Sequence, residues 1–577
     1  MIFFKQFYNL LNGKQKKFFI ALIFFSILIV FLELLSIGLV IPLISLILEP
    51  DKFISNFGLK ESVLFIYAQE VMISKNFIFY FLFFFILIFI LKNFLIFLNH
   101  YLQYKFVENI EVSFSRSIFF KYLSQKYPFF FSNKNSSLIT KLSVDFHNFT
   151  LGFVGQIITL TSEFFIVIGF IALVIYLKLF NVGIVFLIFF SVGAILMKFI
   201  GSLSKKWGNQ RSYFDHLKIN LLNNSFQNIK SIIIDNKRES ITKNFNRYVK
   251  QLAAINRKIF TAKAVPRSIF EIFGIISLSS AIIFMTIYDY DKNYVITTTG
   301  FFIAVAYRIV PSFQKIIYCY QTISFGRVVL NSIEKDIALN NDLSNSEEKI
   351  VFNKSIELKN LYFKYPGRDK IVLKNLDLKI DKGKSVGIYG DSGGGKSTLV
   401  DVMSCLIPSE KGKIKIDDIT LDNDLLIRKW QNQISYVTQN TILFDDSIKN
   451  NITFSSNKDL IDENYLSEII KNTQLSEFIK NLPNKLDTHV GEMGSQLSGG
   501  QRKRIGIARA LYKKPELIIF DEATSELDKE TEEKILSLIF NLKKQMTMIF
   551  ISHDLDVLKK TNEIYKLSDG KLIKINE

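Results

Sequence analysis

Residues 385–400 read SVGIYGDSGGGKSTLV, and this stretch decides the fold of the C-terminal half of the chain. The octet Gly390–Ser397 fits the pattern G-x-x-x-x-G-K-[ST], between an apolar run and a helical run, which is the setting that a phosphate-binding loop requires. In such a loop, backbone amides and a helix N-terminus surround phosphate oxygens. We therefore predict an α/β nucleotide-binding domain around this loop.

The side chains of the loop have separate predicted roles. Lys396 is expected to reach the β- and γ-phosphates of ATP, and Ser397 to ligate Mg²⁺. The nucleotide contacts predicted from the whole loop are Gly390, Ser392, Gly393, Gly394, Gly395, Lys396, Ser397 and Thr398.

A second motif, LIIFDE at residues 517–522, ends an apolar run with two carboxylates. A buried strand would carry Asp521 to its C-terminal tip, where the carboxylate can act on the Mg²⁺ shell. Glu522 would then stand beside the attacking water and polarise it. This pattern alone is a weak indication of an ATPase site, but together with the phosphate-binding loop upstream it is a strong one.

A third motif, LSGGQ at residues 497–501, lies between the other two and is followed by RKRIGIARAL. With these motifs in this order, residues 346–577 resemble the nucleotide-binding domain of ATP-binding-cassette (ABC) transporters. The resemblance implies that the signature residues Ser498, Gly499, Gly500 and Gln501 contact ATP held by the loop of another subunit. A second helix N-terminus would then close on the same anion.

Further family elements match residue by residue. Tyr365 in FKYPG resembles the aromatic residue that stacks on adenine, and Gln439 in YVTQN the glutamine that senses Mg²⁺ and water. His553 in ISHDLD resembles the histidine that contacts the γ-phosphate. Asp528 ends SELD, which resembles the loop that crosses the dimer interface, although Glu526 departs from the usual alanine. The resemblance implies that Glu522, His553 and Gln439 form the catalytic set, and that Ser397, Gln439 and Asp521 hold Mg²⁺.

The first 320 residues have the composition of a membrane domain. Mean hydropathy is +0.24 for the chain of 577 residues, which contains 57 Phe, and the apolar excess lies in this half. Six segments are long enough to span a bilayer. They lie near 18–48, 77–98, 151–177, 180–200, 266–287 and 297–320.

The distribution of charge orients these spans. Residues 201–267 contain fourteen Lys or Arg and three Asp or Glu, so the long connections are expected in the cytoplasm. The same rule accounts for the net charge of +18, so no nucleic-acid partner is expected. We expect the loop tips Phe131–Thr140 and Asn224–Ile233 to contact the soluble domain. The predicted domains are a membrane domain 1–336 with long helical extensions, a linker 337–354 and an ATPase domain 355–577.

Six α-helical spans fused to one such ATPase resemble an ABC half-transporter with the exporter-type fold. One chain supplies one phosphate-binding loop and one signature, and a composite ATP site needs both in opposition. The resemblance therefore implies a homodimer with twelve spans and two ATP sites, closed by two-fold symmetry.

Basic residues inside the spans bear on the cargo. The span segment FIAVAYRIVPSFQKIIYCY, residues 302–320, contains Arg308 and Lys315, and Lys92 and Arg267 lie within or at the edges of other spans. Ionisable residues in spans are rare and usually face a cavity. We interpret these four as candidate ligands of an anionic substrate. Two alternatives stay open: pairing within the bundle to Glu33, Glu163 or Glu271, and, for Lys92 and Arg267, extension toward lipid headgroups.

A narrower resemblance concerns the segments FLELLSIGLVIPLI, AVPRSIFE and AYRIVPSFQKII. They are similar to those of bacterial flippases of lipid-linked oligosaccharides that serve protein glycosylation, the PglK type. This implies a polyprenyl-pyrophosphate glycan as cargo and the bacterial inner membrane as location, with the ATPase domain in the cytoplasm. The alternatives are an exporter of drugs, lipids or peptides, and an ATP-gated channel or regulatory subunit, which the presence of Glu522 disfavours.

Overall fold

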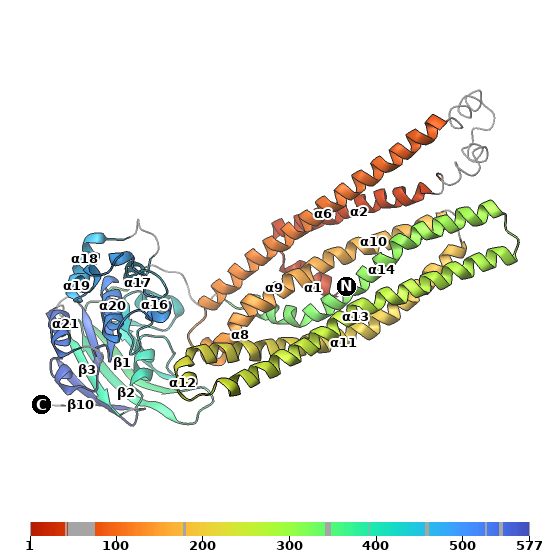
Figure 1. Ribbon diagram of the computed structural model, residues 1–577. Helices are drawn as coiled ribbons and strands as arrows, with labels where there is room; N and C mark the ends of the chain where they lie inside the picture. Colours follow the sequence, from red (N-terminus) through yellow and green to blue (C-terminus); the bar gives the residue numbers. More distant parts are fainter. Residues whose placement is uncertain are drawn as a thin grey trace. The chain divides into compact units, whose positions relative to one another are not determined.

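The computed structural model describes residues 2–40, 43, 75–176, 180–340, 348–391, 393–455, 461–524, 528–541 and 546–575 (Figure 1). Contacts within the chain divide it into two compact units. Unit 1 is Met1–Leu123 with Asn133–Leu339, and unit 2 is Ser124–Ser132 with Asn340–Glu577. The short segment Ser124–Ser132 thus belongs with the C-terminal unit, although it lies between two helices of the first.

Unit 1 is built from helices, several of them far longer than a bilayer requires. They are α1 (Ile2–Leu10), α2 (Gly13–Gly38), α6 (Lys75–Leu123), α8 (Asn135–Thr140), α9 (Phe146–Asn148), α10 (Gly155–Tyr176), α11 (Phe180–Gln227), α12 (Ile229–Ile234), α13 (Arg238–Ile287) and α14 (Lys292–Ile337). At about 1.5 Å rise per residue, the 50-residue α13 extends well beyond the hydrocarbon core.

Local sequence sets several of the helix boundaries and bends. Asn12 caps α2 through a reciprocal capping box with Gln15, which satisfies two free backbone amides. Two π-helical segments, Lys141–Asp145 and Phe149–Val154, flank α9 in the continuous stretch from α8 to α10. Such segments widen one turn and re-aim the side chains that follow.

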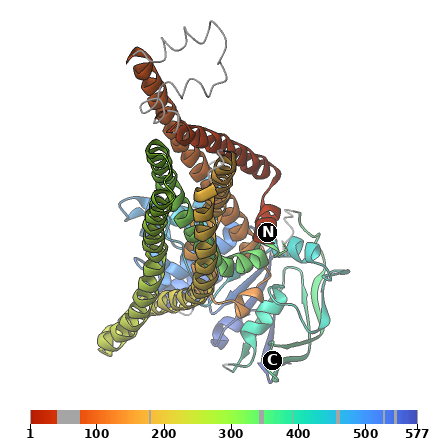
Figure 2. The ribbon, with the colours of Figure 1, turned by 90° about the vertical axis from the view of Figure 1, so that its right-hand side faces the viewer.

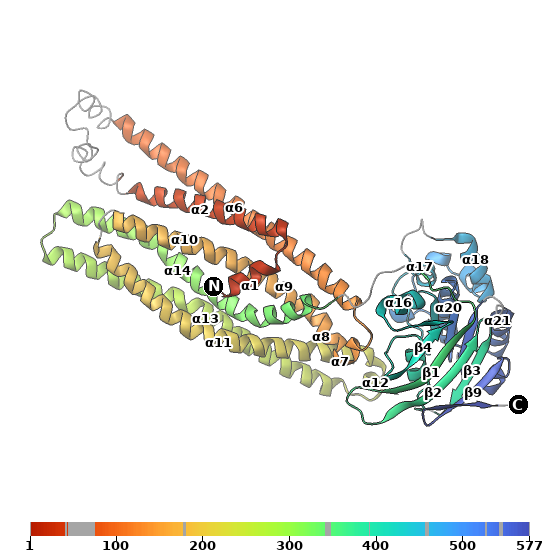
Figure 3. The same ribbon diagram turned by 180° about the vertical axis from the view of Figure 1, so that it is seen from behind.

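Helix pairs organise unit 1. The neighbours α11 and α13 run side by side, and Figure 2 shows them as a yellow and green pair; α14 contacts both. Helix α2 packs against α6 and α10, and the α2–α6 pair splays from the others toward the end where α2 stops (Figures 1 and 3). A buried aromatic and aliphatic core joins α10, α13 and α14; it includes Phe170, Phe270, Phe301 and Phe313.

Five helical stretches among the described residues are long and apolar enough to cross a membrane: Gly13–Gly38, Phe79–Leu123, Asn135–Tyr176, Arg238–Ile287 and Thr298–Ser324. They correspond to five of the six predicted spans. The remaining prediction, 180–200, falls on the first part of α11. Residues 41–42, 44–48 and 177 of two other predicted spans lie outside the described part of the chain.

Unit 2 contains two sheets. The first has the antiparallel order β2-β1-β4-β5, formed by β1 (Ser355–Lys364), β2 (Ile371–Asp381), β4 (Lys411–Ile416) and β5 (Ile419–Thr420). The second has the order β10-β9-β3-β8-β7-β6, formed by β3 (Ser385–Gly390), β6 (Ile434–Val437), β7 (Leu517–Asp521), β8 (Thr547–Ile551), β9 (Glu563–Ser568) and β10 (Lys571–Ile575). Only β10 is antiparallel to its neighbour there.

Helices accompany the sheets of unit 2. They are α7 (Phe129–Ser132), α15 (Lys396–Met403), α16 (Asp424–Gln431), α17 (Ile448–Thr453), α18 (Glu463–Asn472), α19 (Ser476–Lys480), α20 (Gly499–Tyr512), α21 (Lys529–Asn541) and α22 (Leu555–Leu558), with short 3₁₀ turns at Lys485–Asp487 and Glu492–Gly494.

The parallel sheet positions the site. Every residue of β7 and β8 is buried, as expected for parallel strands covered on both faces. Strands β3, β6, β7 and β8 are parallel to one another, so their carboxyl ends share one edge. Ligands of open α/β sheets bind at such an edge. The phosphate-binding loop and the catalytic candidates follow these ends.

Candidate functional site

The phosphate-binding loop is shaped by its glycines. Gly393 and Gly395 have φ of +79° and +98°, a region that side chains rarely adopt. A Cβ atom on Gly390 would lie 2.2 Å from the carbonyl oxygen of Leu567, so only glycine fits there. Ser392 lies outside the described residues. Helix α15 begins at Lys396, which directs its free amides toward the loop.

A cavity of about 600 Å³ opens over the loop in unit 2. Among the described residues, its lining includes most of those predicted for nucleotide, metal and catalysis: Tyr365, Gly393, Gly394, Gly395, Lys396, Ser397, Thr398, Gln439, Asp521, Glu522 and His553. The Lys396 ammonium donates to the carbonyl oxygen of Gly390 at 2.6 Å and lies 3.3 Å from His553 Nε2.

The three predicted catalytic side chains converge on one carboxylate. Gln439 Nε2 donates to Glu522 Oε2 at 2.6 Å, and His553 Nε2 lies 3.2 Å from Glu522 Oε1. Glu522 itself adopts φ +47°, a left-handed conformation that strains a residue with a side chain. The geometry therefore aims a carboxylate into the cavity between an amide and an imidazole.

The predicted metal ligands share this cavity. Ser397, Gln439 and Asp521 all line it, and the Tyr436 hydroxyl donates to Asp521 Oδ2 at 2.9 Å. Burial raises the pKa of Asp521, and the charge of Glu522 adds to that effect, whereas the Tyr436 hydrogen bond opposes it. Burial, with the charge of Asp521, raises the pKa of Asp401 to about 6. Hydroxyl, amide and carboxylate oxygens are hard ligands that suit Mg²⁺.

The side of the cavity where adenine is predicted to bind is aromatic and basic. Tyr365 donates or accepts one hydrogen bond with Thr398 Oγ1 at 3.0 Å, and the Arg368 guanidinium lies 5.8 Å from its ring centre. Phe131 of α7 contacts the same ring edge-on, with centroids 6.1 Å apart. The prediction that the first loop tip contacts the soluble domain is thus confirmed for Phe131. The prediction for Asn224–Ile233 stays a prediction.

The signature residues lie elsewhere. Ser498 caps α20 by accepting from the Gln501 amide at 3.2 Å, while the Gln501 side chain accepts from the Ser498 amide at 2.9 Å. None of Ser498, Gly499, Gly500 and Gln501 is among the described residues that line the cavity. Within one chain, therefore, the signature and the phosphate-binding loop belong to different surfaces.

Asp528 stands at the start of α21. Its carboxylate accepts from the Thr531 amide at 2.9 Å, and that bond holds its pKa below the usual range. Residues 525–527, which complete the predicted interface loop, lie outside the described part of the chain.

A charge network crosses unit 1 between α2, α10 and α14; its two carboxylates are buried, and its Lys315 side chain is 49% exposed. The guanidinium of Arg308 binds both oxygens of Glu33, with Nη2 at 2.9 Å from Oε2, and its Nη1 lies 3.5 Å from Glu163. Lys315 donates to the other oxygen of Glu163 at 2.8 Å. Ser312 accepts from Arg308 Nη1 at 2.7 Å. Two of the alternatives considered from the sequence, pairing to Glu33 and to Glu163, are therefore present.

Lys92 joins this network from α6. It is 8% exposed, lies 3.4 Å from the Ser36 hydroxyl, and sits 4.3 Å from the centre of the Phe89 ring. Lys92, Arg308 and Lys315 give three cations, and Glu33 and Glu163 give two carboxylates, so these five side chains carry a net charge of +1.

Arg267 is not part of the network. Its side chain is 72% exposed and pairs with Glu271 one turn along α13, at 2.8 Å. The four predicted substrate ligands are therefore not brought together within one chain: three share one charge network, and the fourth lies on an exposed helix face.

Profiles of known families match both units. Residues 373–525 match the ABC transporter profile, and residues 18–306 match that of the ABC transporter transmembrane region. The second match alone covers 289 of the 577 residues, half of the chain. The chain belongs to the ABC transporter family.

Lipid flippases and an ABC exporter are similar to this transporter. It is 27% identical, over 467 residues, to the ATP-dependent lipid A-core flippases of Escherichia coli (strain K12) and Shigella flexneri, which covers 79% of this chain and 78% of each relative. It is similar to the structure of a bacterial Atm1-family ABC exporter with ATP bound, with a TM-score of 0.78, 19% identity, and coverage of 97% and 95%. The exporter-type fold predicted from the sequence is confirmed, and a half-transporter of this fold dimerises. The transporter's ATPase domain binds ATP and hydrolyses it to drive transport.

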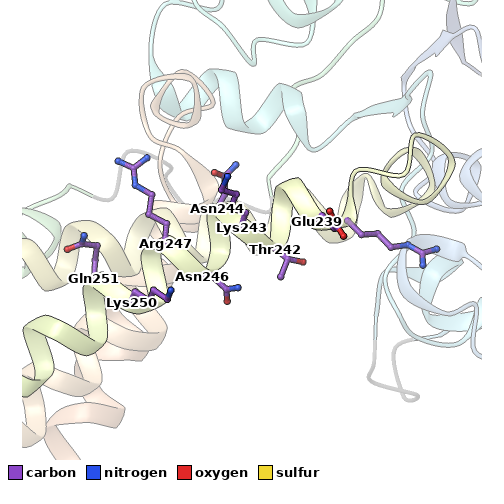
Figure 4. A pocket seen from close by; sticks show the side chains of 9 residues that line it. Glu239, Thr242, Lys243, Asn244, Asn246, Arg247, Lys250 and Gln251 are labelled. Carbon is purple, nitrogen blue, oxygen red and sulfur yellow. The ribbon is translucent and has the colours of Figure 1, made fainter.

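Basic side chains also mark the N-terminal end of α13 in this multi-pass transporter. A shallow hollow there is lined by nine residues, shown in Figure 4, that include Arg238, Lys243, Arg247 and Lys250 against one acid, Glu239. The labelled side chains spread along a single helix in this view, so the hollow is a surface feature. Its charge agrees with the cytoplasmic placement expected from the sequence.

The sequence interpretation missed three residues that shape the transporter's ATP site. Tyr436 and Asp401 surround Asp521, and Arg368 flanks Tyr365. Tyr436 is three residues before Gln439, and Arg368 is three after Tyr365, so proximity to a motif residue was the available signal. Asp401 is likewise three residues after Thr398, but its place beside Asp521 depends on the packing of α15 against the sheet.

Proposed function

We propose that the transporter is a homodimer that uses ATP hydrolysis to flip a polyprenyl-pyrophosphate-linked oligosaccharide across the bacterial inner membrane. The observation that carries this proposal is the net positive charge of the network, in which Lys92, Arg308 and Lys315 outnumber Glu33 and Glu163. Lys92, Glu33 and Glu163 are buried, whereas the Lys315 side chain is half exposed. A buried charge is costly unless it is compensated. A passing pyrophosphate would supply the missing negative charge.

The arrangement of the network supports an anion that is held briefly. Arg308 and Lys315 are tied to carboxylates in this conformation, so a pyrophosphate would compete with Glu33 and Glu163 for the same donors. Arg and Lys form strong charge-assisted hydrogen bonds with carboxylates and with phosphates. Exchange between internal carboxylates and a phosphate group would let the headgroup bind in one conformation and leave in the other.

A polar cavity in unit 1 supports a glycosylated headgroup. It has a volume of about 250 Å³ and is lined by amide, hydroxyl and basic side chains, including Asn148, Gln156, Arg211, Lys263 and Gln321, with no Asp or Glu among its described lining residues. Amides, aromatic rings and cations are suitable partners for sugar hydroxyls and phosphates, and less suitable for an apolar drug.

ATP would act at two composite sites of the homodimer. In each, Lys396 and the loop amides hold the phosphates, and Ser397, Gln439 and Asp521 hold Mg²⁺, which supplies charge neutralisation on the phosphates. Glu522 accepts a proton from the attacking water, and Gln439 and His553 orient that carboxylate. Ser498 and Gly500 of the second chain close on the γ-phosphate from the opposite side.

The second candidate cargo is lipid A-core, which the names of the 27% identical relatives favour. Reconstitution into proteoliposomes distinguishes the two. We expect ATP-dependent flipping of a lipid-linked oligosaccharide with a pyrophosphate, and no flipping of the same glycan on a lipid without it. Faster flipping of lipid A-core would favour the second candidate. ATPase stimulation by hydrophobic cations, with neither glycolipid moved, would favour a drug exporter.

A further inference from the structure

Lys503 is a buried lysine that the mechanism above does not use. It lies on α20, five residues after the helix cap Ser498, and it is 1% exposed. Lysine is almost never fully buried unless its ammonium group has partners. The partners of Lys503 therefore indicate why the chain keeps a charge inside its ATPase domain.

The ammonium group contacts the backbone of the catalytic residues. Lys503 Nζ donates to the carbonyl oxygens of Gln439 and Glu522, the latter at 3.1 Å, and lies 3.4 Å from that of Thr438. Gln439 and Glu522 are the two residues whose side chains bond each other in the cavity. One cation thus ties together the two backbone segments that carry the catalytic amide and the catalytic carboxylate.

The backbone at Glu522 needs such support. Its φ of +47° is strained for a residue with a side chain, and strained conformations persist only where surrounding contacts fix them. The Glu522 amide donates to the Ile551 carbonyl oxygen at 2.9 Å, and its carbonyl oxygen accepts from Lys503. Both sides of the strained residue are therefore held, one of them by α20.

The same helix begins with the signature. Lys503 is five residues after Ser498, or about 7.5 Å along the helix axis at about 1.5 Å per residue. Under the proposed composite sites, Ser498 touches the ATP of the partner, while Lys503 touches the catalytic residues of its own chain. A displacement of α20 on contact with one ATP would therefore reach the other site.

We propose that Lys503 is a positioning residue that couples the two ATP sites of the dimer. It fixes the backbone of Gln439 and Glu522 in its own site, and through α20 it links them to the signature that closes the partner's site. The proposal rests on the proposed composite sites.

The first test distinguishes a positioning role of Lys503 from a role in packing the core. Lys503→Met keeps the length and apolar stem but removes the donor. We expect kcat for ATP to fall about tenfold or more, with the dissociation constant of a fluorescent ATP analogue changed less than about threefold. Lys503→Gln keeps a hydrogen-bond donor group, so its kcat should lie between that of Lys503→Met and that of the parent. Unchanged kcat in a folded Lys503→Met dimer, or loss of folding with both substitutions, would overturn the proposal.

Lys513 supplies a matched control. It follows the same helix, and its ammonium group donates to the carbonyl oxygens of Gln431 and Ile434 at 3.0 Å and 2.6 Å, away from the catalytic pair. Lys513→Met should leave kcat within about twofold. An equal loss of kcat in both variants would indicate a general effect of removing an ammonium group that binds backbone carbonyl oxygens, and would contradict a specific role for Lys503.

The second test uses heterodimers purified through two different tags. One chain carries Glu522→Gln with Lys503→Met, and its partner is the parent, so the remaining active site has the parental Glu522 and the signature of the altered chain. We expect hydrolysis below that of the Glu522→Gln/parent heterodimer. Equal rates would refute coupling through α20.

A control heterodimer keeps this result separate from failure of the proposed function. It replaces Lys503→Met by Ser498→Arg in the Glu522→Gln chain. If composite sites exist, Ser498→Arg lowers hydrolysis by the parental Glu522. If Ser498→Arg has no effect, the composite site itself fails, and the coupling proposal fails with it.

Discussion

At the scale of single residues, the ATP site depends on a carboxylate held in place by its neighbours. Glu522 receives a hydrogen bond from Gln439, an imidazole contact from His553 and a backbone contact from Lys503. These contacts leave little freedom to the carboxylate. Substitution at this position should therefore change its chemistry more than its shape.

Glu522→Gln should abolish turnover and preserve ATP binding. The amide keeps the shape of the side chain but cannot accept the proton of the attacking water, so we expect hydrolysis to fall about 10²–10⁴-fold. Nucleotide trapping and ATPase assays measure this. The contrasting variant Lys396→Ala should lose nucleotide binding. Hydrolysis by Glu522→Gln at the parental rate would contradict the assignment.

Lys92→Met tests the net charge of the membrane network. Removing this cation leaves two cations with two carboxylates, and the loss of one charged hydrogen bond to a phosphate corresponds to about 1.5–3 kcal/mol, or roughly tenfold to hundredfold. We expect flipping of a pyrophosphate-linked lipid to fall by this order while basal ATP hydrolysis stays within about twofold. Lys105→Met, on an exposed face of the same helix, is the control. Normal flipping by Lys92→Met would refute the anion site.

Asp401 makes the stability of the ATPase domain depend on pH. Its folded pKa of about 6 lies above the ordinary 3.8, so its stabilising contribution is present at low pH and is lost as pH rises through 6. Because the group is partly exposed, we expect Asp401→Asn to gain only about 1 kcal/mol at pH 8, or about 2–4 °C in Tm. Thermal unfolding without nucleotide at pH 5 and pH 8 should show a smaller gain at pH 5. An equal gain at both pH values would contradict the assignment.

At the scale of elements, close approach between long helices holds unit 1 together. A Cβ atom added to Gly201 of α11 would lie 2.5 Å from the Tyr320 ring of α14, whereas one added to Gly193 would make an ordinary contact of 3.5 Å with Phe313. The two glycines lie on the same helix and face the same neighbour. They therefore allow a matched comparison.

Gly201→Ala should destabilise the packing of α11 on α14, because the Tyr320 ring has to move out of its place. Overpacking of this kind costs about 1–3 kcal/mol. Thermal unfolding of the purified transporter should show a lower Tm for Gly201→Ala and little change for Gly193→Ala. Equal Tm values for the two variants would show that α14 accommodates the added methyl group without a loss of stability.

At the scale of the whole molecule, the separation of signature and phosphate-binding loop within one chain predicts complementation between chains. A heterodimer of Lys396→Ala and Ser498→Arg chains places both lesions in one composite site and leaves the second intact. We expect ATP hydrolysis to return to about half of the parental rate, above either mutant homodimer. The tagged heterodimer must be shown to form. If ATP hydrolysis does not return in that preparation, the result argues against composite sites.

The sequence by itself determined the chemistry of the ATPase domain and the presence of a helical membrane domain. The loop Gly390–Ser397, the carboxylates of 517–522 and the signature of 497–501 are local patterns, because a turn, a strand end or a helix start is built from neighbouring residues. Apolar length predicts spans for the same reason. The family match and the fold confirmed the ATPase domain and the exporter-type membrane domain, whereas the roles of single site residues stay predictions.

Only the tertiary structure decided the pairing of buried charges. Arg308 meets Glu33, 275 positions away, and Lys503 meets Gln439 and Glu522 through backbone carbonyl groups that have no sequence signature. The sequence offered three acidic partners and could not choose among them, since a span's rotation and its neighbours are set by packing. Arg267 separated from the other cations for the same reason: its helix face is exposed within the chain, and helix periodicity alone does not say which face is covered.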